Sequence, residues 1–158
     1  MLKPVSTQTT EVGGRRFAIV ASNYNSQYVD AMVEGAQRTL ANAGVELIKV
    51  VRVPGAYEIP VTVARLADNP SRPFSACICL GVILRGETAH AQLIGESVTA
   101  ALMQIQLQVG LPIAHEVLLL ENEEQARKRC LDPEHNRGIE AAQTALEMAR
   151  IIRELKPD

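Results

Sequence analysis

The stretch that decides the fold of this chain is Ala76–His90, ACICLGVILRGETAH. It begins with an unbroken apolar run, which is typical of a strand buried on both faces of a sheet. A charged turn follows, where Gly86 permits a sharp bend and Thr88 can cap a helix that begins there. Free backbone N–H groups and the helix dipole attract an anion to such a junction. The stretch therefore predicts an anion site at the carboxyl end of a sheet, with His90 beside it.

Apolar strand-like segments and helix-like segments alternate along the rest of the chain. Strands are predicted at 17–21, 45–53, 75–84 and 112–120. Helices are predicted from the polar cluster 22–26 to about Asn42, at 57–67, from Thr88 to about Gly110, after a cap at Asn122, and at 139–155, with a loop at 131–137. Alternation of this kind implies parallel pairing and right-handed crossovers, which place helices on both faces of the sheet. We predict a three-layer α/β/α sandwich of the flavodoxin-like kind, with a four-stranded parallel sheet.

Length and charge limit the classes of function. The 158 residues are enough for one domain, and the formal net charge is −2. A chain with this charge has no basic surface that would favour nucleic acid or an anionic membrane. Neither a signal pattern nor an apolar run of membrane-spanning length is present. We therefore expect a soluble, cytoplasmic protein that binds neither nucleic acid nor membrane.

The first residues differ in composition from the rest. Residues 1–14 are polar and rich in threonine, and they end in Gly13-Gly14, so we expect an N-terminal arm followed by one domain at 15–158. The arm suits an edge strand that adds to the sheet of a neighbouring subunit, which would make the protein a homo-oligomer. A frayed terminus is an equally open interpretation.

The three cysteines favour no metal site. Cys77 and Cys79 lie two residues apart in the apolar strand and share one face, with no second ligand pair nearby. Small core residues are the better interpretation of both. Cys130 follows a basic run and is expected to be a free thiol.

Four polar or aromatic side chains are candidates for a functional site, and each has a structural alternative. Tyr24 is either a core aromatic or a platform on which a flat ring stacks. Glu58 is either an acid that balances a helix dipole or an acceptor for a polyol. His90 is either a satisfied polar residue or a proton carrier. Arg129, with Arg127 and Lys128, forms either a solvated helix face or a phosphate clamp.

The position of three of these side chains in the predicted sheet is the more specific signal. Tyr24, Glu58 and the pair Thr88/His90 all follow the carboxyl ends of parallel strands, which meet at one edge of the sheet. A ring platform, a polyol acceptor, an anion site and a proton carrier together suit the joining of a sugar-like phosphate to a polar heterocycle.

The motifs of this chain resemble those of the 6,7-dimethyl-8-ribityllumazine synthase family over nearly its whole length, from about Phe17 to the last helix. The segments that carry the resemblance are Val53–Pro60 (VPGAYEIP), Arg85–His90 (RGETAH), Glu121–Ala126 with Arg129, and Asn136–Gly138. These enzymes act in riboflavin biosynthesis. They condense 5-amino-6-(D-ribitylamino)uracil with 3,4-dihydroxy-2-butanone 4-phosphate to 6,7-dimethyl-8-ribityllumazine, releasing phosphate and water without a redox or metal cofactor.

The resemblance implies which residues bind the ribitylaminouracil. Tyr24 matches the aromatic that stacks on the pyrimidinedione ring. Ala56, Tyr57 and Glu58 match residues that contact the ribityl chain and the ring. The polar edge of the ring would be read by backbone groups of Val82, Ile83 and Leu84.

The resemblance also implies which residues bind phosphate and move protons. Glu87 and Thr88 would hold the phosphate of the second substrate, helped by Arg129. His90 matches the histidine that transfers protons. His115 stands where the family contributes a residue, usually Phe, to the active site of the adjacent subunit. The family often has a carboxylate where this chain has Gln92.

The resemblance further implies an assembly of at least a pentamer, or a shell of sixty subunits, with riboflavin synthase as a candidate partner. Two other functions stay open on the sequence. One is a phosphosugar isomerase or lyase that uses the same anion site and His90. The other is a non-catalytic assembly protein that binds lumazine or riboflavin, suggested by the residues Gln92 and His115.

Overall fold

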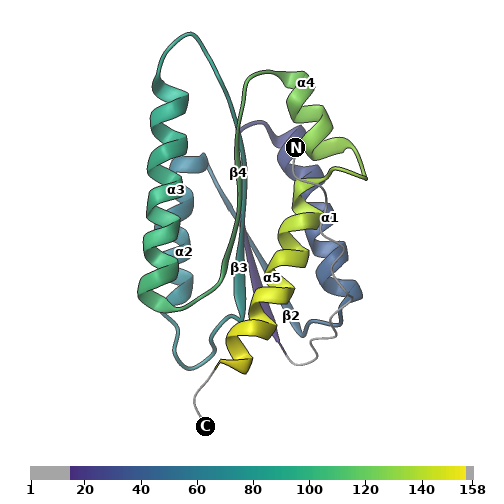
Figure 1. Cartoon of the computed structure of the whole chain (residues 1–158), viewed down its shortest axis with the longest axis vertical. Helices are drawn as coiled ribbons and strands as arrows, with labels where there is room; N and C mark the ends of the chain where they lie inside the picture. Colours follow the sequence, from purple (N-terminus) through teal and green to yellow (C-terminus); the bar gives the residue numbers. More distant parts are fainter. Residues whose placement is uncertain (1–14, 156–158) are drawn as a thin grey trace.

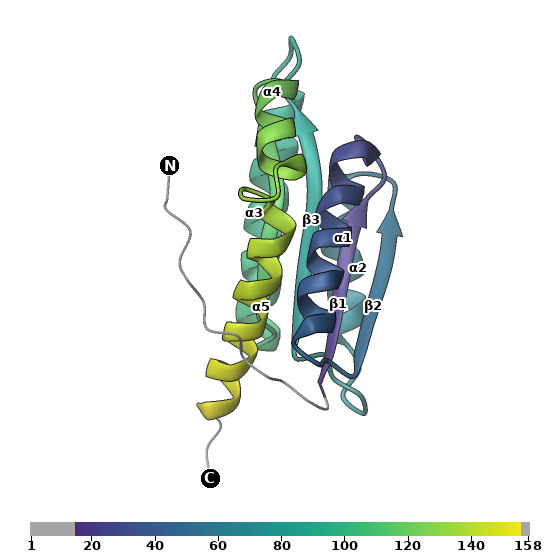
Figure 2. The same ribbon diagram turned by 90° about the vertical axis from the view of Figure 1, so that its right-hand side faces the viewer.

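The structure, a computed structural model, describes residues 15–155. Within them, four parallel strands form one sheet in the order β2-β1-β3-β4. The strands are β1 (Arg16–Ser22), β2 (Leu47–Val53), β3 (Ala76–Leu84) and β4 (Ile113–Leu120). The predicted four-stranded parallel sheet is confirmed. Figure 2 shows β1, β2 and β3 running in the same direction, so that their carboxyl ends meet at one edge.

Helices cover both faces of the sheet, as the alternation of segments predicts. The helices α1 (Ser26–Asn42) and α5 (Arg137–Glu154) lie on one face, and α2 (Ile59–Ala67) and α3 (His90–Val109) lie on the other (Figure 1). The three-layer α/β/α fold is therefore confirmed. A short helix, α4 (Glu123–Ala126), follows β4 on the α5 side and continues into one π-helical turn, η2 (Arg127–Leu131).

Each face of the sheet buries its own apolar core. Strand β3 lies between β1 and β4 and is buried from Ala76 to Val82, which explains its unbroken apolar sequence. Alternate β3 side chains enter opposite cores. Ile78 packs on the side of α1 and α5, whereas Cys77 and Cys79 pack on the side of α2 and α3.

Cys77 and Cys79 are core residues and Cys130 is a free thiol, as predicted. Cys77, Cys79 and Cys130 are free and buried. A hydrogen bond with Cys77, and then burial, raise the pKa of Cys79. Burial, with a smaller effect of the Glu116 charge, raises the pKa of Cys130 to about 12. The Cys130 thiol is therefore protonated near neutral pH and is not a nucleophile.

The ends of several elements differ from the predicted ones. Strand β2 begins at Leu47 and not at 45, because the chain turns through Gly44 with φ +78°. The second helix is preceded by a 3₁₀ turn, η1 (Ala56–Glu58). Residues Arg127–Leu131 continue the short helix as η2, and the predicted loop is correspondingly shorter.

Two predictions about turn residues have different outcomes. The Thr88 hydroxyl accepts the backbone N–H of His90, the first residue of α3, at 3.3 Å, although Ala89 and not Thr88 is the residue directly before the helix. The special role of Gly86 is wrong, because it does not adopt a positive φ and a Cβ placed there meets nothing within 4 Å. The bend at this turn therefore does not require a glycine.

The predicted N-terminal arm, 1–14, lies outside the described residues, so its role as an added strand stays a prediction. No helix within 15–155 has both the length and the apolar character needed to cross a bilayer.

Candidate active site

A pocket opens at the edge of the sheet where β1, β2 and β3 end, beside the start of α3. Its volume is about 900 Å³. It is lined by Tyr24, Asn25, Gly55, Ala56, Tyr57, Glu58, Val82, Ile83, Leu84, Gly86, Thr88, His90, Ala91, Leu93, Ile94 and Ser97. The pocket lies at the edge that the sequence predicts, and its size suits a small-molecule ligand.

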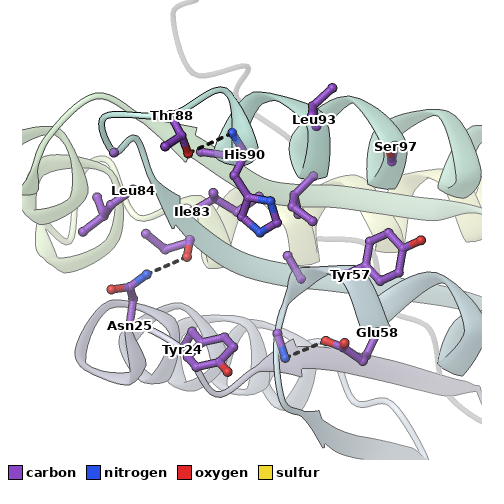
Figure 3. A pocket seen from close by; sticks show the side chains of 16 residues that line it. Tyr24, Asn25, Tyr57, Glu58, Ile83, Leu84, Thr88, His90, Leu93 and Ser97 are labelled. Atoms are coloured by element: carbon purple, nitrogen blue, oxygen red, sulfur yellow. Dashed lines mark hydrogen bonds between the residues drawn. The ribbon is translucent and has the colours of Figure 1, made fainter.

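Asn25 joins the end of β1 to the end of β3. Its backbone is left-handed, with φ 57°, a conformation that asparagine tolerates better than most residues. The side-chain amide donates to the carbonyl of Val82 at 2.8 Å (Figure 3).

The residue before Asn25, Tyr24, is 70% exposed. Tyr24 is therefore not a core aromatic, and its ring is free to stack on a ligand.

Glu58 is held at the opening turn of η1. Its Oε2 accepts the backbone N–H of Gly55 at 2.9 Å. A Cβ on Gly55 would lie 3.0 Å from the ring of Tyr24 and 3.1 Å from the Glu58 carboxylate, so these three residues are in close contact and a larger residue would push one of the two side chains aside. One carboxylate oxygen is thus used to orient the side chain, and the same carboxylate lines the pocket as a candidate acceptor for hydroxyl groups.

His90 begins α3 and points into the pocket (Figure 3). Thr88 and Tyr24 lie on opposite sides of it in this view. The exposed imidazole lies beside the turn at residues 86–88, where the helix start favours an anion. An imidazole in this place can carry a proton to or from a bound substrate.

Gln92, one turn into α3, does not orient His90. Its side-chain oxygen accepts from Arg85 at 2.8 Å, and its amide donates to Glu96 at 2.5 Å. Arg85 also pairs with Glu121 at 2.9 Å. Gln92 therefore belongs to a surface network that ties the ends of β3 and β4 to α3.

Three of the predicted site residues lie outside this pocket. Glu87 is exposed in the same turn but does not line it. His115 lies on β4 and is turned toward α3, where its Nε2 and the hydroxyl of Thr99 are 2.8 Å apart. The Nδ1 of His115 accepts the N–H of Val117 at 3.0 Å, and burial lowers the pKa of the ring. The neutral imidazole therefore donates from Nε2 to Thr99.

Arg129 is the third residue outside the pocket. It lies on η2, which follows α4 on the side of the sheet covered by α5 (Figure 1). The pocket lies on the other side, beside α3. Within one chain, Arg129 and the pocket are therefore on opposite faces of the sheet, and its predicted phosphate role stays a prediction.

Comparison with known proteins decides the family. The model of the family described as 6,7-dimethyl-8-ribityllumazine synthase matches residues 14–153. This chain belongs to that family. The resemblance seen in the motifs is thereby confirmed.

Curated relatives within the lumazine synthase family cover almost the whole chain. A 6,7-dimethyl-8-ribityllumazine synthase of Xanthomonas oryzae pv. oryzae (strain PXO99A) is 41% identical over 144 residues, which are 90% of this chain and 92% of that protein. A protein of the same name from Stenotrophomonas maltophilia (strain R551-3) is 39% identical over 142 residues, which are 89% of this chain and 90% of that protein.

The lumazine synthase motifs left several pocket residues unpredicted. The sequence places Asn25 only in a turn, although its side-chain amide donates to the carbonyl of Val82 near the end of β3. Leu93, Ile94 and Ser97 line the pocket from α3. Their spacing from His90, at i+3, i+4 and i+7, is the signal that could have found them, because residues so spaced share one face of a helix.

No group of three His, Cys, Asp or Glu side chains is placed to hold a metal ion in the part of the chain that the structure describes.

Proposed function

We propose that this protein is a transferase that condenses 5-amino-6-(D-ribitylamino)uracil with 3,4-dihydroxy-2-butanone 4-phosphate to 6,7-dimethyl-8-ribityllumazine, releasing phosphate and water in riboflavin biosynthesis. Family membership supports this function over the isomerase and the non-catalytic assembly protein. The observation that carries it is the pocket where Tyr24, Glu58 and His90, from three distant segments, come together.

The ribitylaminouracil would bind between Tyr24, the end of β3 and Glu58. The exposed ring of Tyr24 offers a face for the pyrimidinedione. Val82, Ile83 and Leu84 are the last three residues of β3. Their backbone groups would form hydrogen bonds with the polar edge of the ring. Glu58, with Ala56 and Tyr57, lines the part of the pocket where the ribityl hydroxyls would bind.

The phosphate substrate would bind at the start of α3. Thr88 and the first N–H groups of the helix suit its phosphate, with Glu87 in the same exposed turn. The amine then attacks the ketone, the carbinolamine loses water to give an imine, phosphate leaves, and the ring closes with loss of a second water. Holding both reactants together supplies much of the rate, and His90 carries protons between steps.

The direct test mixes both substrates with the purified protein and follows lumazine absorbance and fluorescence together with free phosphate. We expect product and phosphate in equal amounts, above the uncatalysed background. Binding of the ribitylaminouracil without product would instead favour the assembly protein. Phosphate release or isomerisation from the butanone phosphate alone would favour the isomerase or lyase.

Replacing His90 by alanine is expected to lower kcat roughly tenfold, since proton transfer is lost while the reactants stay together. The KM values of both substrates should change little. His135→Ala is the matched control, because that ring is bonded to Asp132 outside the pocket. Wild-type turnover in the His90 variant would show that His90 has no role in catalysis.

We further propose that the complete site is shared between copies of this chain, in a homopentamer or a shell of sixty subunits. His115 and Arg129 do not reach the pocket of their own chain. On α3, the large apolar side chains Leu93, Met103 and Leu107 are 60%, 54% and 75% exposed. An apolar helix face of this kind suits a subunit interface. Association with riboflavin synthase and a cytoplasmic location stay predictions.

Replacing Arg129 by alanine is expected to raise the KM for the butanone phosphate about tenfold or more, because one charge-assisted phosphate contact is lost. The KM for the ribitylaminouracil should not change.

Mixed assemblies test whether the site is shared. Co-expressed His90→Ala and Arg129→Ala chains should restore wild-type kinetics at about a quarter of the sites if copies mix at random.

Two results would contradict a shared site. One is the absence of any recovery in mixed assemblies whose mixing is verified by mass spectrometry. The other is a fully active monomer by light scattering. Arg127→Ala is the matched control, since that neighbouring arginine is paired with Glu123 on the surface.

A further inference from the structure

The carboxyl end of β3 extends past the strand that flanks it on one side. Pairing with β4 continues to Leu84, which lies opposite Leu120. Pairing with β1 ends where Leu80 lies opposite Ala21. The last residues of β3, 82–84, line the pocket and therefore have a strand on one side only.

Backbone groups along this end of β3 point alternately to its two sides. The N–H of Arg85, the residue after β3, donates to the carbonyl of Leu120 on the β4 side at 2.8 Å, and Cys77, near the start of β3, also donates on that side. Successive residues of a strand face opposite ways, so residues an even number apart share a side. Val82 and Leu84 therefore direct their N–H and C=O groups away from β4, toward the turn that follows β1. These groups form the free edge of β3.

Asn25 lies in that turn and takes the place of the missing strand. Its side-chain amide donates to the carbonyl of Val82 at 2.8 Å (Figure 3). Val82 is buried, and a buried carbonyl without a donor costs free energy comparable to a lost hydrogen bond. The bond therefore fixes the end of β3 against the turn, next to Leu84, whose backbone groups face the same side.

The backbone of Asn25 fixes the position of Tyr24. Between residues 15 and 155, Asn25 is the only residue other than glycine with a positive φ, 57°. This left-handed conformation turns the chain from β1 into α1, and asparagine tolerates it well. Tyr24 donates its own backbone N–H to the carbonyl of Pro54, just after β2, at 3.2 Å. The turn that carries the exposed ring of Tyr24 is thus tied to the ends of both β2 and β3.

We propose that Asn25 is a positioning residue, which holds the free edge of β3 and the ring of Tyr24 at a fixed distance and angle. The inference rests on the proposed function, in which Tyr24 stacks on the pyrimidinedione and residues 82–84 bind its polar edge. Stacking sets the plane of a ring but not its rotation within that plane, whereas hydrogen bonds to the free edge set the rotation. Both are needed to present the amine to the ketone, because a displacement of about 1 Å can cost roughly a hundredfold in rate.

The main test replaces Asn25 by glycine. Glycine adopts the left-handed conformation freely, so the turn keeps its course while the bond to Val82 is lost. Titration calorimetry with ribitylaminouracil gives its Kd, and steady-state kinetics give kcat and both KM values. We expect the Kd of ribitylaminouracil to rise about five- to tenfold and kcat to fall by a similar factor. The KM for the butanone phosphate should not change, because its proposed place at the start of α3 does not involve Asn25.

Asn25→Asp separates the lost bond from any loosening of the turn. Aspartate tolerates the left-handed backbone and keeps the shape of the side chain, but it presents an acceptor to the carbonyl of Val82 in place of a donor. The Kd of ribitylaminouracil should rise about tenfold or more at pH 8. Asn23→Asp is the matched control, since Asn23 is exposed in the same turn and does not line the pocket. That variant should leave the Kd and both KM values unchanged.

Two results would overturn the positioning role. One is a wild-type Kd for ribitylaminouracil in Asn25→Gly. The other is an equal rise in the KM values of both substrates, which indicates general damage to the pocket. The glycine variant decides even if Asn25→Asp does not fold, because glycine adds no strain at this φ. Urea unfolding verifies that it is folded under the assay conditions.

Lumazine formation measured on the same samples keeps the two proposals apart. Product from wild type, with unchanged ribitylaminouracil binding in Asn25→Gly, would overturn this inference and leave the proposed function intact. Weaker binding in Asn25→Gly, without product from wild type, would support the positioning role of Asn25 and count against the synthase activity.

Discussion

Replacing Gly138 by alanine is expected to cost about 3–5 kcal/mol of the free energy of unfolding, since the added methyl group meets backbone and not a flexible side chain. A Cβ at this position would lie 2.0 Å from the carbonyl oxygen of Met32. Gly138 is in the first turn of α5 and is buried against α1. The two helices would have to separate over their shared core. Urea unfolding, with the midpoint and the slope both recorded, measures the loss.

The matched control is Gly95→Ala in the interior of α3. The nearest heavy atoms to a Cβ there belong to Leu119, at 3.6 and 3.7 Å, which is ordinary contact. Alanine also favours a helix over glycine by up to about 1 kcal/mol, so this variant should be unchanged or more stable. Equal stability of the two variants would show that α1 and α5 do not approach as closely at Gly138 as the structure places them.

Replacing Asn136 by alanine is expected to cost about 2–4 kcal/mol, because it removes a helix cap and leaves buried polar groups without partners. The side-chain oxygen accepts the N–H groups of Gly138 and Ile139 at 2.8 and 3.2 Å. The amide donates to the carbonyls of Cys130 and Ala31 at 2.8 and 3.1 Å. One buried side chain thus joins η2, α5 and α1.

Asn122→Ala is the control for Asn136, since both residues cap a helix. Asn122 is exposed and accepts one N–H, that of Gln125, at 2.9 Å. Its loss should cost only about 0.5–1 kcal/mol. Thermal unfolding of both variants compares them directly. Equal losses would show that the four bonds of Asn136 add nothing beyond capping, and that it does not fasten η2 to the two helices.

Asn136 also illustrates what could be predicted for the fold. The sequence predicts the last helix from 139, and it begins at Arg137 because Asn136 caps it through the N–H groups of Gly138 and Ile139. Asparagine at this point is a signal in the sequence. Its two bonds to Ala31 and Cys130 are not, since they depend on α1 packing against α5. The same holds for Gly138. A glycine is required there because the backbone of Met32 on α1 leaves no room for a side chain, and that contact exists only in the folded chain.

The candidate site divides in the same way. Tyr24, Glu58 and His90 could be predicted, because each lies a few residues after the carboxyl end of a strand and parallel strands end at one edge. The position of Arg129 could not. The sequence predicts a short helix that contains Arg129. It does not predict on which face of the sheet that segment lies, because this depends on how α4 and α5 pack on β4.

The sequence by itself determined the strands, the helices, their order and the edge at which ligand-binding residues gather. These follow from apolar periodicity and chain direction, which are local properties read over a few neighbouring residues. Only the tertiary structure decided that Gln92 turns to Arg85 and away from His90, and that His115 bonds to Thr99. Those choices depend on how α3 packs against β3 and β4, because that packing, and not residue type alone, decides which polar partner lies within reach of each side chain.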